Sequence, residues 1–151
     1  NIKNGLVKEF AQYETRIEEN YLDYIKRLDV LEKEQEAVLL TAKNLSAISF
    51  HGAFEYLTEE TGIHISDTIE SDEGSEPSAK ELAGLSDKIR EDNIKALFID
   101  PNYSGSAAEI LKRETNAEIY VINPVISGEE KLTSYEDIMA ENYKTILKAV
   151  K

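Results

Sequence analysis

His51 is the side chain with the clearest chemical potential in this 151-residue chain, which has one other histidine, His64. It directly follows an apolar run and precedes Gly52 and Ala53, two small residues that permit a sharp turn and the close approach of a ligand. Imidazoles bind metals and transfer protons, but two histidines cannot build a site made wholly of imidazoles. His51 is therefore either one member of a mixed site or a partly exposed histidine hydrogen-bonded to a neighbouring loop. Spacing alone leaves both readings open.

Carboxylates form the second group of candidates. Five of them fall within ten residues: Asp67, Glu70, Asp72, Glu73 and Glu76. Their spacing does not follow that of a calcium loop, which favours a solvated acidic loop. Hydrolysis by a pair of carboxylates stays open, because nothing in the sequence fixes the separation of any two of them. Asp100 ends another apolar run and could act as an acid, although no histidine or lysine is placed by the sequence to assist it.

The composition excludes several classes of function. Thirty acidic against seventeen basic side chains give a formal charge of -13, which repels a phosphate backbone, so nucleic acid is not expected as a partner. The chain has no cysteine, which rules out disulfides, thiolate metal sites and cysteine nucleophiles. No phosphate-binding loop, dinucleotide fingerprint or nucleophile elbow is present. No apolar run approaches the roughly 18 residues that a membrane-spanning helix needs.

The first part of the chain has the period of a helix. Between Leu6 and Ala42, apolar side chains recur three, four or seven residues apart, without proline. A helix of this length would measure on the order of 50 Å, so we expect it to extend beyond any lobe or to break near Tyr13. A coiled coil is the rival interpretation, but the spacing drifts toward 3.6 residues, and Asn20 and Gln35 interrupt a strict heptad.

After Asn44 the pattern changes to short apolar runs that alternate with helical segments. Strands are predicted at 46–50, 63–69, 95–100 and 118–122, and helices at 53–61, 78–93, 106–116 and 134–150. Strict alternation predicts a doubly wound α/β fold with a parallel sheet of about four strands. Ser78 with Glu81 predicts a capping box, Ser134 with Asp137 an acidic version of it, and Gly62 a helix end with positive φ.

The predicted strands and loops indicate where the candidate side chains lie. We expect a long helical segment over residues 1–44 and an α/β lobe over residues 45–151. Open sheets of this kind bind ligands in the crevice outside the carboxyl ends of their strands. The loops at those ends are 51–52, 70–77, 101–105 and 123–128, so His51 lies in the predicted crevice. His64 lies inside the second predicted strand, where a structural role is expected.

Several segments resemble one family, the zinc and manganese binding proteins of ABC importers, also known as the cluster A-I metal-binding lipoproteins. The resemblance is to the C-terminal lobe and the helix that connects the family's two lobes. The matching segments occur in the family's order and spacing, and they are 13–31, 49–57 (SFHGAFEYL), 76–82 (EPSAKEL), 96–101 (ALFIDP), 115–124 (TNAEIYVINP) and 135–142. The resemblance implies the C-terminal lobe of a periplasmic-binding-protein-like fold.

The resemblance also implies a function. The family captures a divalent transition metal in the cleft between two lobes outside the cytoplasm and delivers it to a membrane permease, without enzymatic chemistry. Two histidines of the N-terminal lobe and two residues of the C-terminal lobe bind the metal in this family, and His51 occupies the third position. An imidazole there favours zinc, with manganese next.

The sequence departs from the family pattern in ways that affect the ligand set. It begins near the connecting helix, so the N-terminal lobe and its two histidines are expected to be missing from this chain. Asn123 stands where many relatives have aspartate, and Ile126 where some zinc-specific relatives have glutamate. An uncharged amide is a weaker ligand than a carboxylate, and Glu129, Glu130 or water could supply the contact instead. The expected ligands are therefore His51, Asn123 and Glu129.

The incomplete ligand set has consequences. We expect weak or absent zinc binding by this chain alone, and self-association through surfaces that the other lobe would otherwise bury. Two further functions stay open as alternatives: a surface adhesin, a role described for some members of this family, and a small α/β enzyme that uses Asp100 or the acidic loop.

Overall fold

Four short strands form one parallel sheet. The computed structural model describes residues 1–69, 76–103, 106–125, 131 and 133–151. Within these ranges the strands are β1 (Ser46–Ser49), β2 (His64–Thr68), β3 (Ala96–Ile99) and β4 (Glu118–Val121), in the order β2-β1-β3-β4. All neighbouring strands are parallel. The sheet confirms the predicted fold class, and each strand lies within its predicted range.

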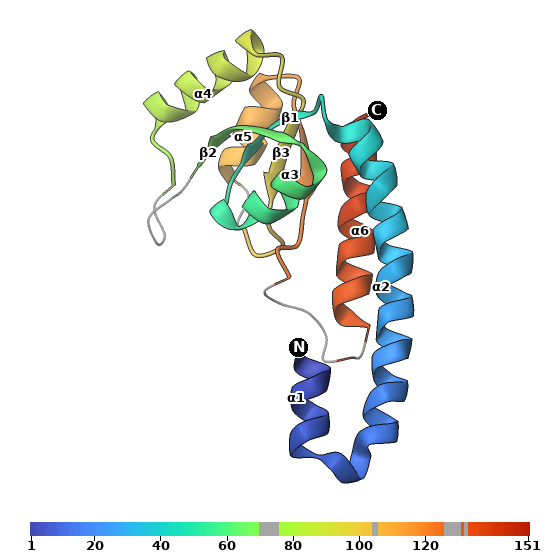
Figure 1. Ribbon diagram of the computed structural model, residues 1–151. Helices are drawn as coiled ribbons and strands as arrows, with labels where there is room; N and C mark the ends of the chain where they lie inside the picture. The colour runs from blue at the N-terminus through green and yellow to red at the C-terminus, as the bar shows by residue number, and fades with distance from the viewer. Residues whose placement is uncertain (70–75, 104–105, 126–130, 132) are drawn as a thin grey trace.

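Helices cover both faces of the sheet (Figure 1). They are α3 (Glu55–Thr61), α4 (Ala79–Glu91), α5 (Ser106–Glu114) and α6 (Ser134–Ala149), and a 3-10 turn, η2 (Gly52–Phe54), precedes α3. Successive strand residues point to opposite faces. Ile48 and Leu97 therefore pack with α4 and α5, whereas Ala47 and Phe98 pack with α6 and with the end of the N-terminal helical segment. Burial on both faces explains the continuous apolar run of the central strand β3.

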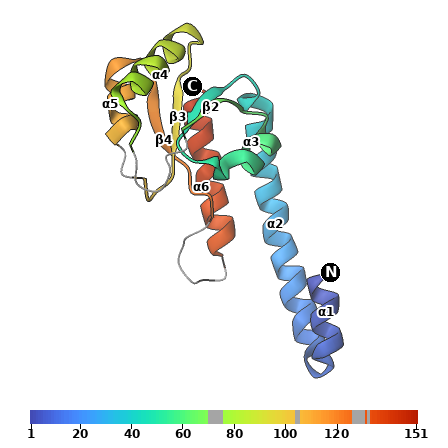
Figure 2. The same ribbon diagram turned by 90° about the vertical axis from the view of Figure 1, so that its left-hand side faces the viewer.

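The N-terminal segment folds as a helical hairpin. It consists of α1 (Ile2–Glu9), a 3-10 turn η1 (Ala11–Tyr13) and α2 (Glu14–Ala42). The Lys3 ammonium lies 2.6 Å from the Glu18 carboxylate across the two helices. The 29 residues of α2 span about 43 Å, and both views show α1 and the first half of α2 projecting beyond the sheet (Figures 1 and 2). No helix in the described ranges combines the length and the apolar character needed to cross a membrane.

The predicted helix ends can be compared with the structure. The predicted capping box is confirmed: Ser78 Oγ accepts the Glu81 N–H at 3.3 Å, and the Glu81 carboxylate accepts the Ser78 N–H at 2.7 Å. Gly62 ends α3 with φ 73°, as predicted. The predicted cap by Ser134 is wrong, because Thr133 is the N-cap of α6 and Ser134 is its first helical residue. The Thr133 hydroxyl instead donates to the Asp137 carboxylate at 2.9 Å, one turn into the helix.

Candidate functional site

The carboxyl ends of the four strands meet at one edge of the sheet. Main-chain hydrogen bonds continue one residue past the strands: the Phe50 N–H donates to the Phe98 carbonyl at 2.9 Å, and the Ile122 N–H to the Ile99 carbonyl at 2.9 Å. The loops after β1, β3 and β4 therefore leave the sheet side by side, at the roughly 4.8 Å spacing of neighbouring strands. This edge is where open α/β sheets bind ligands.

His51 follows β1 at this edge, with an exposed side chain and extended backbone. It is the N-cap of η2, because its Nδ1 accepts the Ala53 N–H at 3.0 Å. Ser49 holds its backbone: the Ser49 hydroxyl donates to the His51 carbonyl at 2.6 Å and accepts the His51 N–H at 3.2 Å. The ring centroid lies 6.5 Å from that of Phe54. The sequence before and after His51 thus presents the imidazole to solvent on a short, well-anchored turn.

The cap bond fixes the state of the free imidazole. Since Nδ1 accepts a hydrogen bond, a neutral His51 ring carries its proton on Nε2. A metal bound at Nδ1 displaces the Ala53 N–H directly. A metal bound at Nε2 requires the proton to move to Nδ1, which then can no longer accept that bond. Metal binding by His51 therefore competes with the N-cap of η2 in either case.

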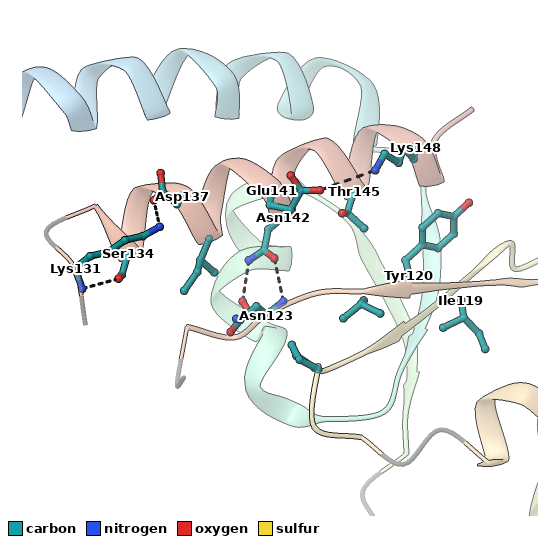
Figure 3. A pocket seen from close by; sticks show the side chains of 13 residues that line it. Ile119, Tyr120, Asn123, Lys131, Ser134, Asp137, Glu141, Asn142, Thr145 and Lys148 are labelled. Atoms are coloured by element: carbon teal, nitrogen blue, oxygen red, sulfur yellow. Dashed lines mark hydrogen bonds and ion pairs between the residues drawn. The ribbon is translucent and has the colours of Figure 1, made fainter. Parts of the chain in front are cut away.

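Asn123 follows β4 at the same edge. Its side-chain oxygen accepts the Val125 N–H at 2.9 Å, which closes a tight turn in which Val125 has φ 63°. Asn123 also lines a groove of about 720 Å³ between β4 and α6, shown in Figure 3. Because β3 lies between β1 and β4, two strand spacings, about 10 Å, separate the strands that carry His51 and Asn123.

The third predicted ligand, Glu129, lies outside the described residues, as do Glu130 and Ile126. Within the described ranges, no three histidine, aspartate or glutamate side chains lie close enough together to hold a metal ion. The structure thus brings His51 and Asn123 to one edge of the sheet without joining them in a closed ligand set.

The acidic candidates take other roles where the structure describes them. The buried Asp100 carboxylate accepts the Asn102 N–H at 2.7 Å and so shapes the turn after β3. Asp67 forms an ion pair with Lys88 at 2.8 Å, so this member of the acidic run is not merely solvated. Glu76 accepts a hydrogen bond from Ser106 at the start of α5. Glu70, Asp72 and Glu73 lie outside the described residues.

Sequence reasoning missed two side chains at this edge. Tyr103 packs against Phe50 with ring centroids 5.0 Å apart, which connects the ends of β1 and β3, and burial together with the Glu76 charge raises the pKa of Tyr103. Asn142 of α6 hydrogen-bonds to the Asn123 backbone. The sequence does contain a signal for Asn142: it is a polar residue at a position on the buried face of α6, between the apolar residues Met139 and Ile146. His64, by contrast, is exposed on the edge strand β2.

Comparison with known proteins places the chain in a metal-uptake context. Residues 1–149 match the family described as zinc-uptake complex component A, periplasmic, ZnuA. The zinc-binding protein AdcA of Streptococcus pyogenes is 29% identical over 148 residues, which are 98% of this chain and 28% of AdcA. The chain therefore spans little more than a quarter of that relative.

Two solved structures share the fold. The Zn(II)-bound ZnuA-like domain of Streptococcus pneumoniae AdcA is 28% identical and superposes with a TM-score of 0.81 over 99% of this chain and 57% of that one. FpvC of Pseudomonas aeruginosa, solved in complex with Mn2+, is 26% identical with a TM-score of 0.78 over 99% and 57% of the two chains.

Proposed function

Because the chain belongs to the ZnuA family of zinc-uptake components, we propose that it forms one lobe of a substrate-binding protein that captures a divalent transition metal, with zinc as its cargo. Members of this family are non-enzymatic metal-binding transport proteins, which argues against the alternative of a small enzyme. The observation that carries the proposal is the exposed His51 imidazole at the carboxyl edge of the sheet.

His51 supplies the defining ligand in this proposal. Neutral imidazole nitrogen suits zinc better than manganese, whose preferred ligands are oxygen atoms. AdcA is named as a zinc-binding protein, whereas FpvC was solved in complex with Mn2+. The proposed preference of this chain for zinc therefore rests on the chemistry of His51. Asn123 and Glu129 are proposed as the additional oxygen ligands of this chain, with the amide oxygen of Asn123 released from its bond to the Val125 N–H.

In this proposal, the remaining metal ligands come from a second lobe. We propose that residues 1–44 join the α/β lobe of residues 45–151 to a second lobe, and that the two lobes enclose the metal between them. The projection of α1 and the first half of α2 beyond the sheet supports this division (Figure 2). The proposed setting is outside the cytoplasm, and the proposed recipient of the metal is an ABC permease, as the family implies.

A titration with zinc and with manganese tests the proposed cargo. Because this chain supplies only part of the ligand set, zinc binding by it alone is expected to be weak but saturable. It should be at least about tenfold tighter than manganese binding, because the site contains imidazole nitrogen. Isothermal titration calorimetry measures both affinities, and an excess of chelator should reverse the binding. Tighter binding of manganese would contradict the zinc assignment. The absence of saturable binding of either ion would contradict the metal site.

The projecting hairpin leads to a second prediction, self-association of this chain. A groove of about 510 Å³ lies between α1 and α2, and Leu6, Tyr21 and Tyr24 line it with partly exposed apolar surface. Ile2, which also lines this groove, is 83% exposed. A two-fold related copy presents the same apolar surface, so pairing of two hairpins buries both. The charge of -13 opposes this pairing, and salt should strengthen it by screening.

Sedimentation velocity over a range of protein and salt concentrations measures the association. Leu6→Glu is expected to shift the chain to monomer, because it places a charge in the apolar groove. Leu40→Glu is the matched control: Leu40 is 82% exposed on the other end of α2, and the change adds the same charge away from the groove. A monomeric wild-type chain at all concentrations, or equal effects of the two variants, would contradict the prediction.

A further inference from the structure

Asn142 is a polar side chain in the core of the lobe. It lies on α6 with 3% of its surface exposed, among buried apolar residues such as Met139 and Ile146. Its Nδ2 donates to the Asn123 carbonyl at 2.8 Å, and its Oδ1 accepts the Asn123 N–H at 2.9 Å. Figure 3 shows the carboxamide directed from α6 onto the Asn123 backbone. Both polar atoms of this buried side chain thus bond to the backbone of one residue, and Nδ2 also donates to the Met139 sulfur at 3.9 Å.

The strand register explains why Asn123 needs this partner. The N–H groups of Glu118 and Ile122 donate to β3, so even-numbered residues of this segment face the sheet. The backbone N–H and carbonyl of odd-numbered Asn123 therefore face the open side of the sheet, where no strand among the described residues follows β4. A side-chain amide has the same donor and acceptor as a peptide group. Asn142 accordingly takes the place of a fifth strand for one residue.

This pairing fixes the turn that follows. With its backbone held by Asn142, Asn123 directs its own side-chain oxygen to the Val125 N–H at 2.9 Å. Val125 has φ 63°, an unfavourable conformation for a β-branched residue, which persists only where the surroundings enforce it. The Asn142 carboxamide is the buried group that anchors the start of this turn.

We propose that Asn142 is a positioning residue of the metal site, which holds the Asn123 backbone at the carboxyl edge of the sheet, so that the Asn123 amide oxygen can reach the metal once it leaves the Val125 N–H. This inference rests on the proposed function, since Asn123 is a ligand only in that proposal. Partners that orient metal ligands affect affinity without touching the metal, and their loss commonly weakens binding by about 10- to 100-fold. Asn142 would act in this way through the Asn123 backbone.

The test compares Asn142→Leu with Ile146→Val in the full chain. Leucine has a similar volume but no hydrogen-bonding atoms. Ile146→Val removes one methyl group from a fully buried side chain one turn along α6 and leaves the loop contacts intact. Asn142→Ala is the second variant should the leucine variant fail to fold. Amide hydrogen exchange followed by NMR reports on the loop, and zinc titration of the folded protein reports on affinity.

In Asn142→Leu, the Asn123 amide should exchange at least about tenfold faster than in the wild-type chain, relative to amides of β3, and zinc affinity should fall about tenfold. Both quantities should stay at wild-type values in Ile146→Val. Unchanged exchange at Asn123, or faster exchange with unchanged zinc affinity, would overturn the positioning role. A wild-type chain that fails to bind zinc would overturn the proposed function instead, and this outcome is visible before any variant is compared.

Discussion

Replacing His51 with asparagine should remove zinc binding by this chain while preserving its fold. Asparagine is a good N-cap residue, so its side-chain oxygen can accept the Ala53 N–H that Nδ1 of His51 accepts now. It lacks the basic nitrogen that zinc prefers. We expect zinc affinity to fall by about 100-fold or more, which corresponds to at least about 2.7 kcal/mol of binding free energy. Calorimetric titration of both proteins measures the change.

Two further variants separate the metal ligand from the cap. His51→Ala removes both functions, so it should lose zinc binding and also lower the free energy of unfolding by about 1 kcal/mol, the usual cost of a lost cap. His64→Asn is the matched control, because His64 is the other histidine and is exposed on the edge strand β2. Its zinc affinity should equal that of the wild-type chain. Equal losses in His51→Asn and His64→Asn would indicate nonspecific binding by surface imidazoles.

Replacing Arg27 with methionine should destabilise the lobe by about 2 kcal/mol. Arg27 of α2 and Glu136 in the first turn of α6 form an ion pair with Nε and Oε1 3.1 Å apart. The Glu136 side chain is 11% exposed, and neither of its carboxylate oxygens has a hydrogen bond within the described part of the chain. Methionine keeps the apolar stem but leaves this carboxylate without its cation. Urea unfolding measures the loss.

The same ion pair joins the long helix to the lobe, so a double-mutant cycle with Glu136→Gln is informative. Removing the charge of Glu136 should recover much of the stability lost in Arg27→Met, because no buried charge is then left unpaired. Lys144→Met serves as the control on α6: Lys144 forms an exposed pair with Glu141 at 3.8 Å, and its loss should change stability by less than about 0.5 kcal/mol. Equal effects of Arg27→Met and Lys144→Met would refute a special role for the partly buried Arg27–Glu136 pair.

The architecture was predictable because local and tertiary preferences agree in the α/β part of the chain. Strands such as Ala96–Ile99 are buried on both faces, so their apolar runs are unambiguous, and Gly62 marks a helix end by its own conformational freedom. The capping box at Ser78 has a local signature that needs no tertiary information. His51 could be placed at the edge where ligands bind because it comes directly after an apolar run that predicts the strand β1.

The rest of the site depends on contacts between distant segments or on side-chain rotamers, neither of which local sequence determines. The pairing of Asn142 with Asn123 joins residues 19 apart and follows from β4 being an edge strand, which is a property of the whole sheet. The bond between His51 Nδ1 and the Ala53 N–H depends on a side-chain rotamer, and the packing of Tyr103 on Phe50 depends on two strands being neighbours. Ser134 is not the cap because α6 begins at Ser134 itself, so Thr133 takes the N-cap position, without a side-chain bond to the helix backbone.

Long-range 1H–15N NMR spectra of the two imidazoles, recorded with and without zinc, test the central claim most directly. The spectra identify which ring nitrogen of each histidine carries a proton and which one binds a metal. We predict a proton on Nε2 of free His51, a large shift of one His51 nitrogen when zinc is added, and no change at His64. A shift confined to His64, or unchanged His51 nitrogens at zinc saturation, would contradict the account.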